Sequence, residues 1–188
     1  IAQAPLAPNI QTAFDIGTGS GVIAAILAKR GIPDIIATDT NPKAIACATA
    51  NLERLSLDKA VNIQSIDLFP ETCADLIVCN PPWLPAKPTS AIETALYDPN
   101  HAMLTAFLNG VRQHLNPNGE AWLIISDLAE HLHLRDKDFL NQCFQTASLN
   151  VVDILKTKPQ HKKAIDESDP LAFARNKETT YLYRLKAI

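Results

Sequence analysis

The sequence has little of what marks membrane-spanning, secreted or disulfide-stabilised proteins. Its longest purely apolar run, Val22–Ala28, has seven residues, whereas a membrane-spanning helix needs about 20. No signal-peptide pattern opens the chain, because Ile1–Pro8 has no positive charge and holds two prolines. The 4 cysteines form no C-x-x-C pair, so we expect reduced thiols and neither a disulfide framework nor a metal cluster. These absences predict a cytoplasmic protein with no membrane segment and no bound metal.

A strong excess of one charge is also missing. Of the 188 residues, 17 are basic and 20 acidic, which gives a formal net charge of −3. Sequence-independent binding of nucleic acid depends on many cationic contacts, so this balance argues against it. The hydrophobic fraction of 47% excludes a disordered chain. The length suits one folded domain, which we expect to be monomeric. Because the first residue is Ile1 and not Met, we expect further sequence upstream.

Short apolar strands alternate with helices along most of the chain. Strands are predicted at residues 12–16, 35–39, 61–65, 75–79, 121–126, 151–156 and 179–185. Helices are predicted at 20–30, 42–55, 102–115 and 136–146, with a turn at 116–119 and a Pro-rich loop at 80–99. Apolar strands that alternate with helices are typical of a parallel sheet covered on both faces. The predicted fold class is α/β: a doubly wound, mostly parallel seven-stranded sheet whose last two strands form an antiparallel pair at one edge.

Polar residues stand at the end of each of the first four predicted strands. The first strand runs into Asp15-Ile-Gly-Thr-Gly-Ser-Gly21, the second ends at Asp39, the third precedes Asp67 and Leu68, and the fourth precedes Asn80. In open α/β sheets the ligand lies beyond the carboxyl ends of the strands. The four strand ends are therefore predicted to meet at one crevice.

The glycine cluster indicates which ligand is excluded. Gly17, Gly19 and Gly21 let the backbone turn sharply and approach a ligand closely. A dinucleotide-binding G-x-G-x-x-G would need glycine where Val22 stands, and a phosphate-binding P-loop would need a lysine that this loop lacks. The spacing therefore fits neither phosphate cradle.

Two acidic residues suggest a nucleoside. Asp39 lies 18 residues after Gly21, where an acid can accept both hydroxyls of a ribose. It could instead cap the next helix, a role that is also open to Asn41. Asp67 could accept from an adenine amino group or merely close a turn. Together with the glycine spacing, these residues predict a nucleoside site without a phosphate cradle.

Asn80-Pro-Pro-Trp83 is the most specific motif of the sequence. Two consecutive prolines fix the backbone and hold the preceding Asn80 extended. The side-chain oxygen of Asn80 and the carbonyl of Pro81 could then accept both hydrogens of a planar NH₂ group. The indole of Trp83 offers a flat face for stacking. A stiff loop with a buried aromatic is the alternative interpretation.

The motifs together resemble those of class I S-adenosylmethionine-dependent methyltransferases of the Asn-Pro-Pro-aromatic type, over residues 12–185. The resemblance implies one catalytic domain over residues 1–188, with S-adenosyl-L-methionine as cofactor and a recognition domain upstream. It implies catalytic roles for Asn80 and Pro81 and substrate contacts for Pro82 and Trp83. The cofactor-binding residues that it implies are Asp15, Gly17, Thr18, Gly19, Gly21, Asp39, Thr40, Asp67, Leu68 and Asn80.

Within this group the chain is similar to the HemK-type release-factor glutamine methyltransferases and the small-domain methyltransferases. It departs from the HemK type in having Trp83 in place of tyrosine and in the stretch Leu84–Tyr97. The favoured acceptor is a glutamine side-chain amide of a protein such as a release factor. The alternatives are an amino group of an RNA base and a non-catalytic scaffold with the same fold. The net charge of −3 favours a protein acceptor over RNA.

Two other groups of residues are weaker candidates: the two histidines are expected to have no metal-binding role, whereas the lysine patch could contact RNA or an acidic protein partner. His131 and His133 point apart on a helix and have no third ligand nearby. A basic patch at residues 156–163 holds four lysines. These lysines are Lys156, Lys158, Lys162 and Lys163, and Asp166, Glu167 and Asp169 largely offset their charge.

Overall fold

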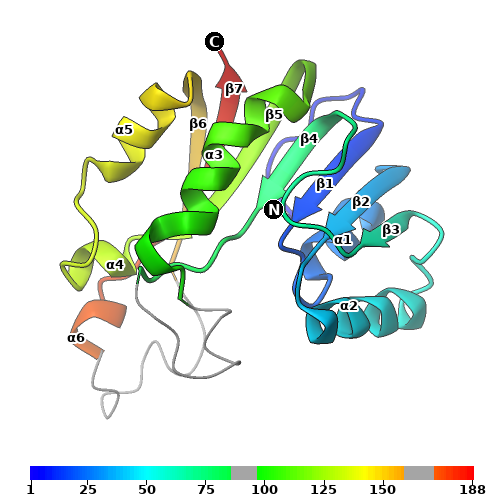
Figure 1. Cartoon of the computed structure of the whole chain (residues 1–188), viewed down its shortest axis with the longest axis horizontal. Helices are drawn as coiled ribbons and strands as arrows, with labels where there is room; N and C mark the ends of the chain where they lie inside the picture. Colours follow the sequence, from blue (N-terminus) through cyan, green and yellow to red (C-terminus); the bar gives the residue numbers. More distant parts are fainter. Residues whose placement is uncertain (86–96, 159–171) are drawn as a thin grey trace.

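The computed structural model describes residues 1–85, 97–158 and 172–188. Within these residues seven strands form one sheet in the order β3-β2-β1-β4-β5-β7-β6. The strands are β1 (Thr12–Ile16), β2 (Asp34–Thr38), β3 (Val61–Gln64), β4 (Ala74–Cys79), β5 (Leu115–Ser126), β6 (Leu149–Thr157) and β7 (Thr180–Ala187). The first five strands pair in parallel, and β7 pairs antiparallel with both β5 and β6. The predicted fold class is confirmed, including the antiparallel edge (Figure 1).

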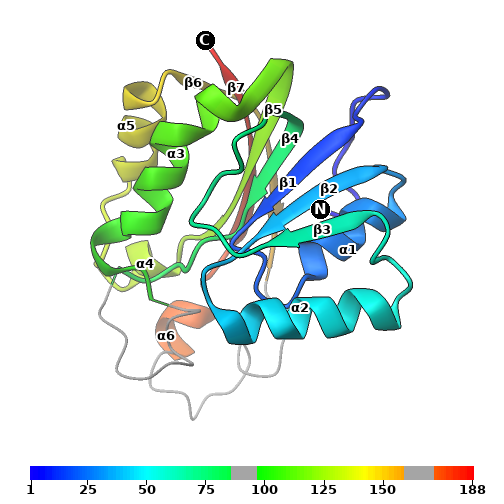
Figure 2. The ribbon, with the colours of Figure 1, turned by 45° about the vertical axis from the view of Figure 1, so that its right-hand side comes forward.

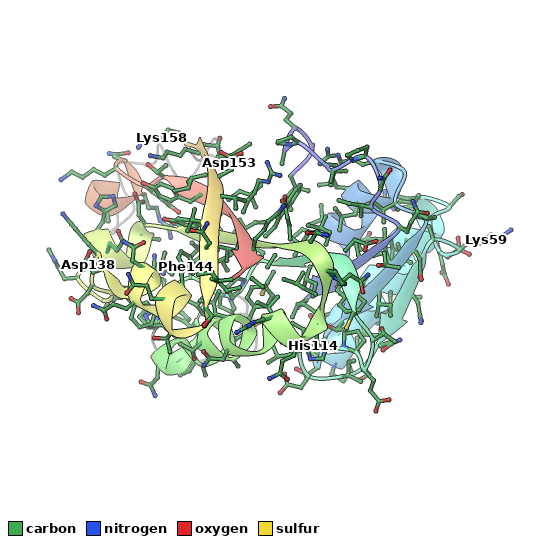
Figure 3. The ribbon with its side chains drawn as sticks, turned by 90° about the horizontal axis from the view of Figure 1, so that it is seen from above. Lys59, His114, Asp138, Phe144, Asp153 and Lys158 are labelled. Carbon is green, nitrogen blue, oxygen red and sulfur yellow. The ribbon has the colours of Figure 1, made fainter. Side chains whose placement is uncertain are left out.

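Helices cover both faces of the sheet. They are α1 (Val22–Lys29), α2 (Pro42–Arg54), α3 (Ala102–His114), α4 (Leu128–His131), α5 (Phe139–Thr146) and α6 (Ala172–Arg175), with a short 3₁₀ turn, η2, at Pro99–His101. Figure 2 shows α3 and α5 on one face and α1 on the other. In Figure 3 Phe144 of α5 lies on the sheet side of its helix, where its ring packs 5.3 Å from that of Tyr183. Of these helices, none has both the length and the apolar character needed to cross a bilayer.

Two hydrophobic clusters, one on each face, form the core. Strand β4 contributes to both, because successive side chains of a strand point to opposite faces. Ile77 and Cys79 join α3 and α5 in one cluster, whereas Leu76 and Val78 join α1 in the other. All four of these side chains are fully buried. This two-sided burial is why the strand reads as a continuous apolar run.

The prediction of a separate turn at residues 116–119 is wrong. Strand β5 begins at Leu115, which pairs with Ala74, and regular pairing resumes where Glu120 meets Leu76. The intervening residues form an irregularity inside the strand, and Asn118 has a positive φ of 67°. The side-chain amide of Asn116 donates to Asp75 Oδ1 at 2.8 Å, which holds this segment against β4. The segment has a turn-forming composition, but its contact with a residue of β4 keeps it in the sheet.

Candidate functional site

A cavity of about 380 Å³ lies at the carboxyl ends of β1, β2 and β4. These parallel strands run toward the same side of the molecule (Figure 1). Nine residues with a predicted site role line the cavity: Gly17, Thr18, Gly19, Asp39, Thr40, Asp67, Leu68, Asn80 and Pro82. The other four, Asp15, Gly21, Pro81 and Trp83, are not on its wall. The structure thus brings together residues that lie as much as 65 positions apart in the sequence.

The glycine loop has the backbone conformation for which glycine is needed. Gly17 and Gly19 have φ values of +68° and +56°, in the left-handed region. A Cβ on Gly17 would lie 2.4 Å from Cε of Met103. Glycine at this position therefore lets Met103 of α3 reach the wall of the cavity, where it faces the loop.

Asp39 connects the ends of β1 and β2. Its Oδ2 accepts the backbone N–H of Gly19 at 2.9 Å, and its Oδ1 accepts that of Asn41 at 2.8 Å. Asn41, not Asp39, caps α2, because its side-chain oxygen accepts the N–H of Lys43 at 3.0 Å. Each carboxylate oxygen of Asp39 keeps further acceptor capacity. A pair of ribose hydroxyls is the ligand that such a half-buried carboxylate on a cavity wall would suit.

Thr38, the last residue of β2, joins the loops that follow β1 and β3. Its carbonyl accepts the N–H of Thr18 at 2.8 Å, and its hydroxyl donates to the carbonyl of Leu68 at 2.7 Å. Thr38 is fully buried. The two bonds hold the loop after β1 and the loop after β3 in place on either side of β2.

Asp15 lies beneath the glycine loop and is fully buried. Burial raises its pKa to about 6, and the negative charge of Asp39 adds to the rise. Hydrogen bonds act in the opposite direction: Oδ2 accepts from the hydroxyl of Thr18 at 2.6 Å and from the N–H of Ala24 at 3.0 Å. Its Oδ1 has no hydrogen-bond partner among the residues that the structure describes. Asp15 therefore braces the loop from below while keeping one acceptor atom unused.

The charge of the cavity wall selects among ligands. Asp39 and Asp67 contribute carboxylates, and none of the described residues on the wall is lysine, arginine or histidine. Such a wall opposes the phosphates of a nucleotide and favours a ligand with hydroxyls and positive charge. S-Adenosyl-L-methionine has ribose hydroxyls, a sulfonium, an ammonium group and a single carboxylate, and its net charge is positive. The residues present therefore fit this cofactor.

Asn80 follows β4 directly and its exposed side chain lines the cavity together with Pro82. Its Oδ1 accepts the indole N–H of Trp83 at 3.1 Å. The end of the motif is anchored at Leu84, which is 2% exposed and packs in a cluster with Leu128 and Ala129 of α4. The carbonyl of Leu84 also accepts the N–H of Asp98 at 2.7 Å. The motif thus runs from the end of β4 to the buried side chain of Leu84.

Comparison with known proteins identifies the family of the chain. Residues 4–153 match the family described as the methyltransferase small domain. A release factor glutamine methyltransferase of Cereibacter sphaeroides is 34% identical over 140 residues, which cover 66% of this chain and 50% of that protein. A tRNA1(Val) (adenine(37)-N6)-methyltransferase of Cytophaga hutchinsonii is 34% identical over 134 residues, covering 66% of this chain and 56% of that protein. The chain spans about half the length of these curated relatives.

Solved structures show the same fold at low sequence identity. The ribosomal protein L11 methylase of Lactobacillus delbrueckii subsp. bulgaricus superimposes with a TM-score of 0.64 at 18% identity, over 96% of this chain and 71% of that one. A methyltransferase of Thiobacillus denitrificans, in complex with S-adenosyl-L-homocysteine, superimposes with a TM-score of 0.63 at 16% identity, over 95% of this chain and 85% of that one.

The fold is that of a class I S-adenosylmethionine-dependent methyltransferase. The chain belongs to the methyltransferase small domain family. The predicted family and the predicted cofactor, S-adenosyl-L-methionine, are thereby confirmed.

Several residues of the cavity were missed by the sequence analysis. Met103, the single methionine of the chain, lies in a predicted helix and also lines the cavity wall, a role that the sequence does not predict. Thr38 and Ala44 belong to predicted elements and gave no separate signal. Val22 also lines the cavity, and its side chain is 57% exposed although it is apolar. Its position directly after Gly21 was the available signal.

The residues predicted to lie outside the site have local roles. Lys158 Nζ donates to the carbonyls of Lys177 and Glu178, at 2.8 and 3.2 Å, and so ties the end of β6 to the start of β7. Lys162 and Lys163 lie outside the described residues. His131 Nε2 lies 3.4 Å from Asp127 Oδ1. In the described parts of the chain, no three His, Cys, Asp or Glu residues are grouped as metal ligands.

Proposed function

We propose that this protein transfers the methyl group of S-adenosyl-L-methionine to a nitrogen that is conjugated with a planar group. The acceptor we favour is a glutamine side-chain amide of a protein such as a release factor. The observation that carries the proposal is the position of Asn80, whose exposed side chain stands on the cavity wall directly after β4 and before two prolines. A cytoplasmic location accompanies this proposal, since translation factors act there.

The chemistry requires alignment more than a strong base. An amide or exocyclic amino nitrogen is a poor nucleophile because its lone pair is delocalised. When bound, the cofactor supplies a methyl group that is activated by the positive sulfonium. Asn80 Oδ1 and the carbonyl of Pro81 accept the two N–H groups of the acceptor and favour a geometry in which the nitrogen lone pair faces that methyl group. The same two oxygens stabilise the positive charge that develops on nitrogen. The N–CH₃ bond forms as the S–CH₃ bond breaks, so that the neutral thioether S-adenosyl-L-homocysteine is left and the surplus proton of the nitrogen goes to water.

Both the protein and the RNA acceptor have a named relative at 34% identity. The formal charge of −3 supports the protein amide, because RNA binding gains from cationic contacts with phosphate. The RNA base remains the second candidate, supported by the relative named as a tRNA adenine methyltransferase.

The test incubates the protein with methyl-labelled cofactor and cell lysate that has been treated with ribonuclease or with protease. Label that survives ribonuclease and disappears with protease selects the protein amide, and the reverse pattern selects RNA. The variant Asn80→Ala should bind the cofactor normally and lose about 100-fold or more of turnover. Asn150→Ala is the matched control, since Asn150 is exposed on β6 and apart from the cavity. Unchanged turnover in Asn80→Ala would contradict the proposal, and normal cofactor binding with no turnover in the unmodified protein would favour the non-catalytic scaffold.

A further inference from the structure

We propose that Trp83 is a positioning residue that keeps the side-chain oxygen of Asn80 directed for use as a hydrogen-bond acceptor. The inference rests on the proposed function, because it concerns how Asn80 meets the acceptor nitrogen. It goes beyond the stacking role predicted for this ring. The basis is the hydrogen bond from Trp83 Nε1 to Asn80 Oδ1, at 3.1 Å.

The chemistry of the two side chains makes this contact directional. An indole N–H is a donor and never an acceptor, whereas a side-chain amide has an acceptor oxygen at one end and a donor NH₂ at the other. The indole can therefore bond only the oxygen end of Asn80. With the ring in place, a rotation of the amide by 180° would bring two donors face to face. The amide orientation is thus fixed by the partner.

The orientation matters because the proposed acceptor group is also a donor. A planar NH₂ group needs oxygen atoms to receive its hydrogens, and the flipped amide of Asn80 would present its own NH₂ instead. The amide oxygen has two lone pairs. One receives the indole N–H, which leaves the second for the acceptor nitrogen. Trp83 therefore excludes the unproductive orientation without using up the acceptor atom.

The surroundings of Trp83 hold its ring in a defined place. The residue is half-buried and packs against the hydrophobic cluster that contains α3. It is followed by Leu84, which is 2% exposed. A ring that is supported on one side and anchored at the next residue cannot follow the amide if the amide rotates. Asn80, which is exposed, has no such packing, and its orientation depends on the indole.

The first experiment removes the donor and keeps a flat ring. Trp83→Phe should lower turnover with saturating acceptor by about three- to tenfold, the range that one hydrogen bond provides. The dissociation constant for the cofactor should be unchanged. Trp83→Phe turnover within twofold of the unmodified protein would overturn the inference.

The second experiment separates orientation from a merely structural effect. A carboxylate has acceptor oxygens at both ends, so a flip has no consequence in the Asn80→Asp background. Trp83→Phe should therefore cost less than about twofold in that background. An equal loss in both backgrounds would overturn the inference and would assign Trp83 to stacking or folding.

The third measurement does not depend on activity. The chain has two tryptophans. Trp122 lies on β5, where it pairs with Val78 of β4, but its Nε1 donates to Glu120 Oε2 at 3.0 Å and not to Asn80. In ¹H–¹⁵N spectra, Asn80→Ala should move the indole N–H signal of Trp83 and leave that of Trp122 in place. An unmoved Trp83 signal would overturn the inference. If the unmodified protein is active and Trp83→Phe is equally active, only this inference is refuted. If Asn80→Ala shifts the Trp83 signal but the unmodified protein transfers no methyl group, only the proposed function is refuted.

Discussion

Asp15 and Asp39 follow the same rule of position, at or just after the end of a parallel strand, and yet have different environments. Asp39 is half-buried and uses both oxygens to hold neighbouring loops. Asp15 is fully buried beneath the glycine loop, where burial raises its pKa to about 6. We expect Asp39 to bind the ligand and Asp15 to support the glycine loop. Their variants should therefore differ in what they change.

Replacement of Asp39 should weaken cofactor binding. Asp39→Ala removes a charged acceptor from the wall and also frees the N–H of Gly19, so the dissociation constant for S-adenosyl-L-methionine should rise about 10- to 100-fold. Calorimetric titration measures this directly. Asp34→Ala is the control, because Asp34 is exposed at the opposite end of the same strand. Equal affinities for the two variants would show that Asp39 does not contact the ligand.

Asp15 should make stability depend on pH. Its pKa is about 6 in the folded protein against an ordinary value of 3.8, so the folded state holds the proton more tightly than the unfolded state. The contribution to stability is therefore complete below pH 3.8 and is lost as pH rises through 6. Between about pH 4.5 and 7.5 this loss amounts to about 2 kcal/mol.

The variant Asp15→Asn isolates this contribution because it cannot titrate. Its free energy of unfolding, relative to the unmodified protein, should rise by about 2 kcal/mol from about pH 4.5 to 7.5. Urea unfolding at the two pH values measures the change. A difference between the two proteins that is the same at both pH values would show that the pKa of Asp15 is not raised.

At the scale of elements, the site depends on how α3 begins. The Oδ1 and Oδ2 atoms of Asp98 accept the N–H groups of Met103 and Leu104, at 2.9 and 3.0 Å. Its own N–H donates to the carbonyl of Leu84. Asp98 therefore connects the end of the Asn80 motif to the first turn of the helix that carries Met103 to the cavity. One residue thus links two parts of the site, through its carboxylate on one side and its backbone N–H on the other.

Removal of this carboxylate should destabilise the protein. Asp98→Ala leaves two N–H groups without a partner at a buried helix start, which should cost about 1–3 kcal/mol of unfolding free energy. Chemical denaturation gives this value. Asp138→Ala is a matched control: Asp138 precedes α5 without a side-chain capping bond, is exposed and lies at the outer edge of the molecule (Figure 3). A loss no larger than that of Asp138→Ala would argue against the capping role.

At the scale of the whole molecule, the ligand connects loops that belong to different parts of the sheet. A ligand in the cavity contacts loops after β1, β2, β3 and β4 at once. Binding to the folded state alone shifts the unfolding equilibrium by mass action. Because the described wall has no basic side chain, this stabilisation should depend on the charge of the ligand.

Thermal unfolding tests that selectivity. S-Adenosyl-L-methionine at 100 times its dissociation constant should stabilise the protein by about 2.7 kcal/mol. ATP and NAD at the same concentration should give no measurable shift, since their phosphates would face two carboxylates and no basic side chain on the described wall. Asp34→Ala should retain the shift, whereas Asp39→Ala, with a dissociation constant raised about 10- to 100-fold, should lose about half of it or more. A comparable shift with ATP would mean that phosphates are accommodated, contrary to the charge argument.

The sequence by itself determined the alternation of strands and helices, the parallel core of the sheet with its antiparallel edge, and the family to which the chain belongs. These depend on local signals: apolar runs such as that of β4, a cap such as Asn41, and glycines at positive φ. The predicted turn at 116–119 failed because the contact between Asn116 and Asp75 joins residues 41 positions apart.

Only the tertiary structure decided how the site is held together. Met103 lies against Gly17, Thr38 binds the carbonyl of Leu68, and Asp39 binds the N–H of Gly19. None of these contacts leaves a periodic pattern in the sequence, because each joins segments that meet only after the sheet has formed. The bond between Trp83 and Asn80 is short in sequence but depends on the direction of a ring that the core supports. Local preferences fix the elements, whereas packing fixes which side chains face each other across the cavity.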